Sequence, residues 1–131
     1  MKKIIFGITS LTLGGAEKVL VDLANKLSEN YDITILTIYA KGEFEKKLNS
    51  NVKLKTIFDF QFNELSNLKK KITALKILFF KKYYYKKYIK RDYDIEIAFL
   101  EGPITRLFSV KNKNTRKIAW IHNDISKVYG K

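Results

Sequence analysis

An apolar run, a pair of glycines and an amphipathic segment follow one another at the start of the chain. Residues 4–9 are largely apolar and β-branched, which predicts a strand, and apolar residues at helical spacing from Val19 to Leu27 predict a helix. Between the two lie Gly14 and Gly15, which would let a ligand approach the backbone closely. The free N–H groups at the start of the following helix would attract an anion. The alternative is that these glycines only make a tight turn.

The composition limits the class of protein. The 131 residues are 46% hydrophobic, which suits one folded domain with a substantial core. The absence of cysteine excludes disulfides and thiolate metal sites and fits a reducing compartment. The single histidine, without a cluster of carboxylates, argues against a transition-metal site. We therefore expect no metal.

No apolar run approaches the roughly 20 residues that a membrane-spanning helix needs. The first apolar run follows Met1-Lys2-Lys3, as in a secretion signal, but it is short and β-branched and no small-residue cleavage site follows it. We interpret this run as a strand and expect a cytoplasmic protein.

Strand and helix patterns alternate along the rest of the chain. Residues 31–39 are β-branched or aromatic almost throughout, which predicts a second strand that is covered on both faces and parallel to the first. Residues 52–58 alternate apolar and basic side chains, which predicts a strand near the sheet edge with its basic face in solvent. Further elements are a helical turn over 43–48, strands over 94–100 and 116–121, and a helix over 104–110 that Pro103 begins. This order predicts an α/β fold, a Rossmann-like parallel sheet with helices on both faces.

Two features expected of a nicotinamide-binding protein are missing. Dinucleotide-binding folds place an acidic residue after the second strand to hold the ribose hydroxyls, and residues 37–41 contain none. The glycine loop also lacks the G-x-G-x-x-G spacing. Both observations argue against a nucleotide-dependent oxidoreductase.

The segment between Glu64 and Asp92 contains no acid, glycine or proline, and its residues 69–91 hold 10 of the chain's 26 lysines and arginines. Without these ten, the formal net charge of +13 would be +3, so the excess charge belongs largely to this segment. Apolar residues spaced by three or four predict an amphipathic helix; they are Leu65, Leu68, Ile72, Leu75 and Phe79.

A basic amphipathic helix rich in tyrosine and phenylalanine is typical of a helix that lies on an anionic membrane. The residues that we expect to make this contact are Lys81, Lys82, Tyr84, Lys86 and Lys87. The alternative is a helix whose apolar stripe packs on the sheet while the lysines are solvated. The two interpretations are compatible if the apolar stripe faces the core and only the Lys/Tyr end of the helix reaches lipid. No known nucleic-acid-binding motif accompanies the basic residues, so we expect no nucleic-acid partner.

Polar groups follow three of the predicted parallel strands. They are the Gly14-Gly15 loop, Glu101, and His122 with Asn123 and Asp124. Because the carboxyl ends of parallel strands meet at one edge of a sheet, we expect these groups to converge. A carboxylate and an imidazole there can bind hydroxyls or transfer protons. Taken singly, the histidine could be structural, Glu101 could stabilise a helix start, and Asp124 could be a turn residue or cap.

Four stretches of the chain together resemble the amino-terminal half of a family 4 glycosyltransferase of the GT-B fold. They are 4–27 with its Gly-Gly-Ala-Glu motif at 14–17, the strand 31–39, Phe-Leu-Glu-Gly at 99–102, and Ile-Ala-Trp-Ile-His at 118–122. The likeness runs through nearly the whole chain and is weakest in the Lys/Tyr-rich segment.

The resemblance implies two Rossmann-like domains with the active site between them, the first binding mainly the acceptor and the second mainly the nucleotide-sugar donor. Members of this family transfer a sugar with retention of anomeric configuration, usually without a metal. Many act on lipid-linked or membrane-surface acceptors in making cell-envelope polysaccharide, which would give the basic segment a role in membrane docking.

The resemblance also implies roles for individual residues. Gly14 and Gly15 would approach the donor diphosphate and the acceptor, His122 would face the transferred sugar, and Glu101 with Thr105 would line the acceptor side. Glu17 and Asn123 lie in the matching motifs and are further candidates for substrate binding.

Residues 1–131 correspond to one such domain, without the donor-binding domain and its paired-glutamate motif. We therefore expect no sugar transfer by this chain alone; the nucleotide sugar, a co-substrate rather than a cofactor, would be held by a further domain or a partner chain. The expected partners are a sugar or lipid-linked acceptor and the anionic inner face of the cell membrane. The alternative is a non-catalytic peripheral membrane or interaction module that keeps the fold.

Overall fold

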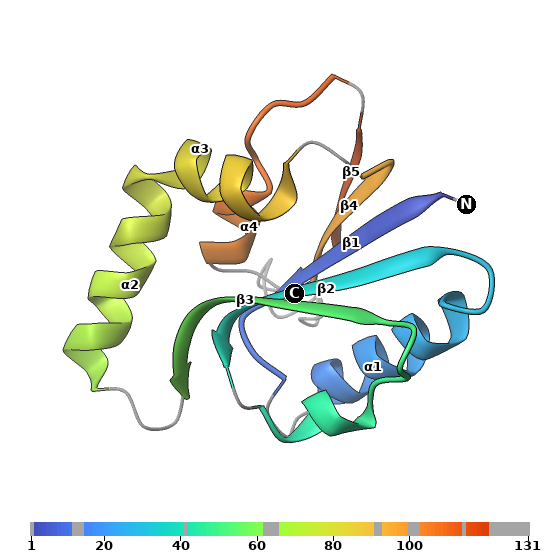
Figure 1. Ribbon diagram of the computed structural model, residues 1–131. Helices are drawn as coiled ribbons and strands as arrows, with labels where there is room; N and C mark the ends of the chain where they lie inside the picture. The colour runs from blue at the N-terminus through green and yellow to red at the C-terminus, as the bar shows by residue number, and fades with distance from the viewer. Residues whose placement is uncertain are drawn as a thin grey trace, which may run out of the picture.

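Five parallel strands form one sheet in the part of the chain that the computed structural model describes, in the order β3-β2-β1-β4-β5 (Figure 1). That part comprises residues 2–11, 15–40, 42–61, 66–90, 93–99, 103–113 and 115–120, without the side chains of residues 60, 61 and 120. The strands are β1 (Lys3–Ile8), β2 (Asp32–Ala40), β3 (Lys53–Gln61), β4 (Ile95–Phe99) and β5 (Arg116–Trp120). The strand order reverses between β1 and β4, as in Rossmann-like proteins, and confirms the predicted fold class.

Helices cover both faces of this sheet (Figure 1). They are α1 (Gly15–Leu27), α2 (Asn67–Phe79), α3 (Lys81–Tyr84) and α4 (Pro103–Leu107), with a 3₁₀ turn η1 (Glu43–Lys47) and a π-helical turn η3 (Tyr85–Ile89). Helix α1 lies on one face, and α2, α3 and α4 lie on the other. The prediction of helices on both faces is confirmed.

The two faces of β1 belong to two separate cores because successive strand residues point to opposite sides. Ile4, Phe6 and Ile8 pack in the core beneath α1, whereas Ile5 packs in the core beneath α2, η3 and α4. All four side chains are buried, and burial of each contributes about 1.5–3 kcal/mol to the free energy of folding.

Strand β3 lies at the edge of the sheet, as its alternating pattern predicts. Its basic face is only partly in solvent, which corrects the expectation from sequence. Lys53 is exposed, but Lys55 is half-buried and its Nζ donates a hydrogen bond to the carbonyl of Tyr88, 3.1 Å away. The edge strand is therefore tied to the helical layer above it.

The continuous helix predicted between residues 64 and 92 is wrong. Ser66 caps α2 by accepting a hydrogen bond from the backbone N–H of Lys69 at 3.2 Å, but α2 ends where Phe80 leaves helical geometry, with φ −115° and ψ 29°. Helix α3 and the π turn η3 follow in a new direction (Figure 1). This break brings Tyr85 and Ile89 into the same core as Ile77, and the packing of these side chains outweighs the uninterrupted local helix propensity.

The apolar stripe of α2 points away from the sheet, which corrects the alternative in which it packs on the core. The buried side chains of α2 are Thr73 and Ile77. The stripe residues are exposed: Leu68 by 68%, Ile72 by 44%, Leu75 by 48% and Phe79 by 74%. Leu65 lies outside the described residues. The larger apolar side chains of α2 are thus available to a partner.

Candidate functional site

The reversal of strand order between β1 and β4 marks the place where an open α/β sheet binds ligands. The two strands pair in parallel from Ile4–Ile95 to Gly7–Ala98, so their carboxyl ends lie side by side. Helix α1 follows β1 on one face of the sheet and α4 follows β4 on the other (Figure 1). A ligand at this edge would meet the starts of both helices.

The predicted site residues divide into those that the structure places at this edge and those that lie outside its described residues. Gly15 is the first residue of α1 and is exposed, and Glu17 is half-buried in the first turn of the same helix. Thr105 is half-buried on α4. These three residues therefore flank the reversal point from opposite faces of the sheet. The remaining candidates, Gly14, Glu101, His122, Asn123 and Asp124, lie outside the described residues.

The backbone that enters the glycine loop is held by the neighbouring strand and turn. The Thr9 carbonyl accepts hydrogen bonds from the N–H groups of Ile38 and Tyr39, each at 3.0 Å, and the Leu11 carbonyl accepts one from Phe44 at 2.8 Å. A Cβ on Gly42 would lie 2.3 Å from the Leu11 carbonyl carbon and oxygen, closer than side-chain atoms can approach. Gly42 is thus a positioning residue that the sequence reasoning missed.

A second glycine sets the position of α4. A Cβ on Gly7 would lie 2.6 Å from the Ile104 Cγ1 atom and 2.6 Å from the Phe108 ring, so α4 can approach β1 only because this position has no side chain. Ile104 and Phe108 are buried. The contact fixes the helix that carries Thr105 against the reversal point.

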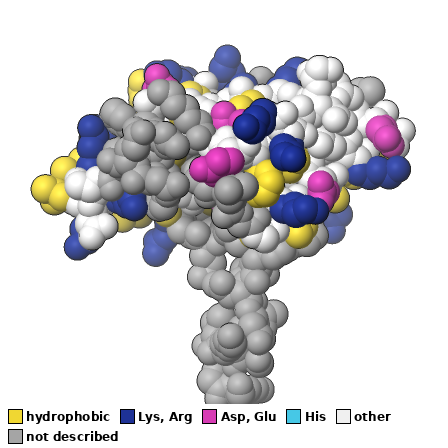
Figure 2. Space-filling model, turned by 90° about the horizontal axis from the view of Figure 1, so that it is seen from below, with side chains coloured by type: hydrophobic (Ala, Val, Ile, Leu, Met, Phe, Trp, Pro, Cys, Tyr) yellow, Lys and Arg dark blue, Asp and Glu magenta, His cyan; other side chains and the backbone are white. Residues whose placement is uncertain are grey.

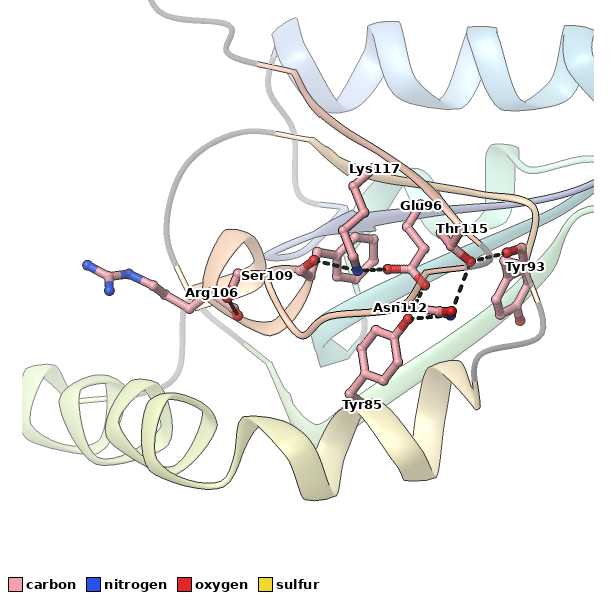
Figure 3. Close-up of polar contacts among 9 residues, drawn as sticks. Tyr85, Tyr93, Glu96, Arg106, Ser109, Asn112, Thr115 and Lys117 are labelled. Atoms are coloured by element: carbon pink, nitrogen blue, oxygen red, sulfur yellow. Dashed lines mark hydrogen bonds and ion pairs between the residues drawn. The ribbon is translucent and has the colours of Figure 1, made fainter.

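A buried polar network lies between β4, β5 and η3 (Figure 3). The Glu96 carboxylate is fully buried; it accepts a hydrogen bond from the Tyr85 hydroxyl and pairs with the Lys117 Nζ at 2.5 Å. The Lys117 Nζ also donates to the Phe108 carbonyl at 2.8 Å. The Asn112 amide donates at 3.1 Å both to the Tyr85 hydroxyl and to the Thr115 hydroxyl.

This network is structural rather than catalytic. Glu96 is the second residue of β4, near the amino end of the strand and away from the carboxyl edge where a substrate is expected. Both of its described partners hold the carboxylate inside the protein, and a buried carboxylate of this kind must be paired to be tolerated. Sequence reasoning missed this pair, although a lone acid inside the apolar run 95–99 is a signal from which it could be found.

The residues predicted to contact a membrane lie on α3 and η3. Lys82, Lys86 and Lys87 are exposed and Lys81 is half-buried. The Nζ of Lys87 lies over the rings of Tyr83 and Tyr88, 5.8 and 5.4 Å from their centroids. The four lysines are thus accessible to an anionic partner.

Tyr84, the fifth of these residues, is half-buried and belongs to an aromatic cluster. Its ring centroid lies 5.9 Å from that of Phe58 on β3 and 6.4 Å from that of Tyr88. Burial, followed by the neighbouring Tyr83 and Tyr88, raises the pKa of the Tyr84 hydroxyl above its ordinary value of 10.0, and Lys87 lowers it. The hydroxyl is therefore neutral at physiological pH.

Basic and apolar side chains occur together at the α2 end of the molecule. Figure 2 shows dark blue and yellow side chains side by side at the left of the view, the end at which Figure 1 places α2. None of the described helices is long and apolar enough to cross a bilayer. Within the same described residues, no three histidine, aspartate or glutamate side chains gather as a metal ion would require.

Comparison with known proteins adds one relative. No protein-family model matches the chain. The chain is similar to the GalNAc-alpha-(1->4)-GalNAc-alpha-(1->3)-diNAcBac-PP-undecaprenol alpha-1,4-N-acetyl-D-galactosaminyltransferase of Campylobacter jejuni subsp. jejuni serotype O:2, with 42% identity over 65 residues. The matched region makes up 50% of this chain and 18% of the relative's length. The match relates the chain to a glycosyltransferase.

Proposed function

We propose that the chain is the acceptor-binding domain of a GT-B glycosyltransferase that takes its sugar from a nucleotide-sugar donor and works at a membrane surface. The observation that carries this proposal is the 42% identity over 65 residues to a glycosyltransferase, in a chain whose sheet is Rossmann-like. Because the match spans 18% of the relative, we propose that transfer requires a donor-binding domain in addition to these residues. The reaction retains the anomeric configuration and serves the synthesis of cell-envelope polysaccharide or glycolipid.

In this proposal the acceptor lies at the reversal point between β1 and β4. Thr105 and Glu101 contact its hydroxyls, Gly15 and Gly14 leave room for the donor diphosphate, and His122 faces the transferred sugar. The exposed start of α1 supports this arrangement, since a side chain added at Gly15 would meet nothing within 4 Å. Open space there is consistent with a bound ligand.

The name of this relative describes an acceptor attached to undecaprenol through a diphosphate. We propose that the present protein also acts on a lipid-linked acceptor, at the inner face of the cell membrane. The exposed stripe of α2 supports membrane contact, because insertion of a leucine or phenylalanine side chain contributes up to about 1.5–3 kcal/mol. Each lysine near an anionic surface adds about 1 kcal/mol. The apolar and electrostatic contributions together are enough for reversible binding to a membrane.

Sugar transfer tests the catalytic part of the proposal. The protein, purified in the form that its natural host expresses, is incubated with radiolabelled nucleotide sugars and a lipid-linked acceptor. Transferred label is then counted in the lipid extract. We expect His122→Ala to lower the rate at least about 100-fold, as loss of a positioned proton-transfer or polar group does. The matched control is Lys113→Ala on an exposed loop. Unchanged rates in both His122→Ala and Glu101→Gln would contradict the assigned roles, and turnover by the 131 residues alone would contradict the need for a donor domain.

Vesicle co-sedimentation tests the membrane part. We expect the chain to bind vesicles that contain phosphatidylglycerol, and binding to fall at least about tenfold when Ile72, Leu75 and Phe79 become serine. These side chains are exposed, so the fold is kept. Val19→Ser, at a side chain exposed by 42% on α1, is the control. Equal binding by the triple variant and the control would overturn the docking role of α2.

The exposed stripe also favours a second candidate, a peripheral membrane module without catalytic activity. The sugar-transfer assay and the vesicle co-sedimentation together distinguish this module from a glycosyltransferase. Vesicle binding by the host-expressed protein, without transfer from any nucleotide sugar, would support the module and contradict the glycosyltransferase.

A further inference from the structure

A pocket of about 980 Å³ lies between the segment α3–η3 and the loop that follows α4. Its lining residues are Lys81, Lys82, Tyr85, Lys86, Lys90, Ser109, Val110 and Lys111. Five of these eight are lysines and none is acidic. Lys18, Lys26, Lys53 and Lys117 form ion pairs with described carboxylates, and none of these four lysines lines the pocket. The pocket therefore concentrates positive charge that no described carboxylate offsets.

The buried polar network holds both sides of this pocket in place. Tyr85, which lines one side, is 1% exposed and its hydroxyl donates to Glu96. Asn112 follows the lining residues of the other side, and its amide donates to the same hydroxyl at 3.1 Å. Figure 3 shows Tyr85 and Asn112 meeting at this point. The buried Tyr85 hydroxyl thus connects the two sides of the pocket.

Lys90 reaches the pocket from a backbone conformation that side chains rarely adopt. Its φ is 60°, in the left-handed region, and its N–H donates to the Tyr85 carbonyl at 2.9 Å to close η3. Glycine or asparagine would adopt this conformation more readily than lysine does. Among non-glycine residues of the described chain, Lys90 is the position with positive φ.

We propose that this pocket binds a phosphate group with two negative charges, carried either by a lipid headgroup or by a soluble phosphate ester. Ammonium groups gathered in a concave site repel one another, and a doubly charged anion offsets that repulsion while accepting several charge-assisted hydrogen bonds. The Tyr85 ring and Val110 exclude water on part of the surface, which strengthens these interactions. The setting at a membrane rests on the proposed function, whereas binding of the phosphate depends on the pocket alone.

Titration of the ¹⁵N-labelled full chain with inorganic phosphate, and then with glycerol 3-phosphate, tests the pocket by NMR. At constant ionic strength, adjusted with chloride, we expect saturable shifts in the amides of residues 81–90 and 109–111. The double variant Lys81→Gln/Lys111→Gln should bind at least about tenfold more weakly, because it removes two charge-assisted contacts. Lys71→Gln, on the exposed part of α2, is the matched control and should bind as the wild type does.

A second variant separates loss of charge from loss of fold. Lys90→Asn removes one pocket lysine while suiting the left-handed backbone, so we expect weaker phosphate binding with an equal or higher urea midpoint. Shifts that stay linear with phosphate, that chloride alone reproduces, or that persist unchanged in the double variant and in Lys90→Asn would overturn the proposal.

Vesicles distinguish the two sources of phosphate. Phosphatidic acid carries a phosphomonoester headgroup, and phosphatidylglycerol a singly charged diester. If glycerol 3-phosphate displaces the chain from phosphatidic-acid vesicles, the pocket takes the headgroup; if it binds without displacing the chain, the ligand is soluble. Either result supports the pocket. If the host-expressed protein binds phosphate but transfers no sugar, the proposed function is contradicted and the pocket is kept.

Discussion

The helices α1 and α2 have the same length, 13 residues, and opposite relations to the sheet. In α1 the buried residues are Leu20, Val21 and Ala24, so its apolar side faces the strands. In α2 the buried residues are Thr73 and Ile77, whereas the stripe Leu68, Ile72, Leu75 and Phe79 faces outward. An amphipathic pattern therefore tells which residues share a face, but not whether that face meets the protein's own core.

The two helices also differ in the charges that they carry. Helix α1 mixes acids and bases, with Lys18 3.2 Å from Asp22, and Lys26 of its last turn 3.5 Å from Glu29. Exposed pairs of this kind stabilise little, but they leave the surface nearly neutral. The segment 66–90 has no acid at all. An outward apolar stripe beside a series of lysines is the combination found on surfaces that meet anionic lipid.

The largest contrast is expected between leucine-to-alanine substitutions in the two helices. Leu20→Ala in α1 should lower the free energy of unfolding by about 3 kcal/mol, because it leaves a cavity where the side chain was fully buried. Leu75→Ala in α2 should change it by less than about 0.5 kcal/mol, since that side chain is 48% exposed. Urea unfolding followed by circular dichroism measures both. Equal losses would mean that the stripe of α2 is buried in solution.

The next largest effect is expected in the buried polar network around Glu96. Lys117→Ala would leave the buried Glu96 carboxylate without its cation, and we expect a loss of about 2 kcal/mol, below the usual range because Lys117 keeps 29% of its side chain exposed. Lys113→Ala, in the exposed loop nearby, is the matched control and should be neutral. The readout is the urea midpoint of each variant. If Lys117→Ala is as stable as its control, the ion pair between β4 and β5 does not stabilise the fold.

A smaller effect is expected from glycines on the α1 side. Gly42→Ala should lower the free energy of unfolding by about 1–2 kcal/mol, because its Cβ would meet the Leu11 backbone at 2.3 Å. Gly15→Ala has open space around the new methyl group and should be neutral or slightly stabilising. Thermal unfolding of the two variants tests the difference. An unchanged midpoint for Gly42→Ala would show that the Leu11 backbone can yield.

The smallest effect is the pH dependence of the aromatic cluster. Burial raises the pKa of Tyr84 above 10.0, so the neutral hydroxyl stabilises the fold fully below pH 10 and this contribution is lost as pH rises through the folded-state pKa. Between pH 9 and pH 11, the wild type should therefore lose stability more steeply than Tyr84→Phe in urea unfolding. Tyr83→Phe removes a hydroxyl from a more exposed ring of the cluster and serves as control. Parallel slopes for the wild type and Tyr84→Phe would contradict the raised pKa.

The strands themselves were predictable because their signals are local. The run from Ile33 to Tyr39 is β-branched or aromatic and is fully covered in the fold, and the alternation in 52–58 identifies an edge strand. The break at Phe80 had no such signal, since it depends on where Tyr85 and Ile89 must lie in the tertiary core. The role of Gly42 was hidden for the same reason, because it depends on a backbone contact with a residue far away in sequence.

The candidate site was predictable only in part. Parallel topology led to the expectation that the Gly14-Gly15 loop lies at the ligand-binding edge, and Gly15 starts the helix that follows β1 there. Glu17 and Thr105 were candidates only through the family resemblance, and the roles of all three residues stay predictions. The roles of Glu101 and His122 stay predictions. The lysine-lined pocket could not be predicted from the sequence. Its lining comes from residues 81–90 and 109–111, which only tertiary packing brings together.

The π turn η3 gives the chain one residue more than an α-helix would need over the same span. Its closing hydrogen bond runs from Lys90 to Tyr85, five residues back rather than four. If the same residues were wound as a regular α-helix, Lys90 would lie about 100° further around the helix axis. Lys90 would then lie away from the other lysines of the pocket, so the alignment of these positive charges depends on the extra residue in η3.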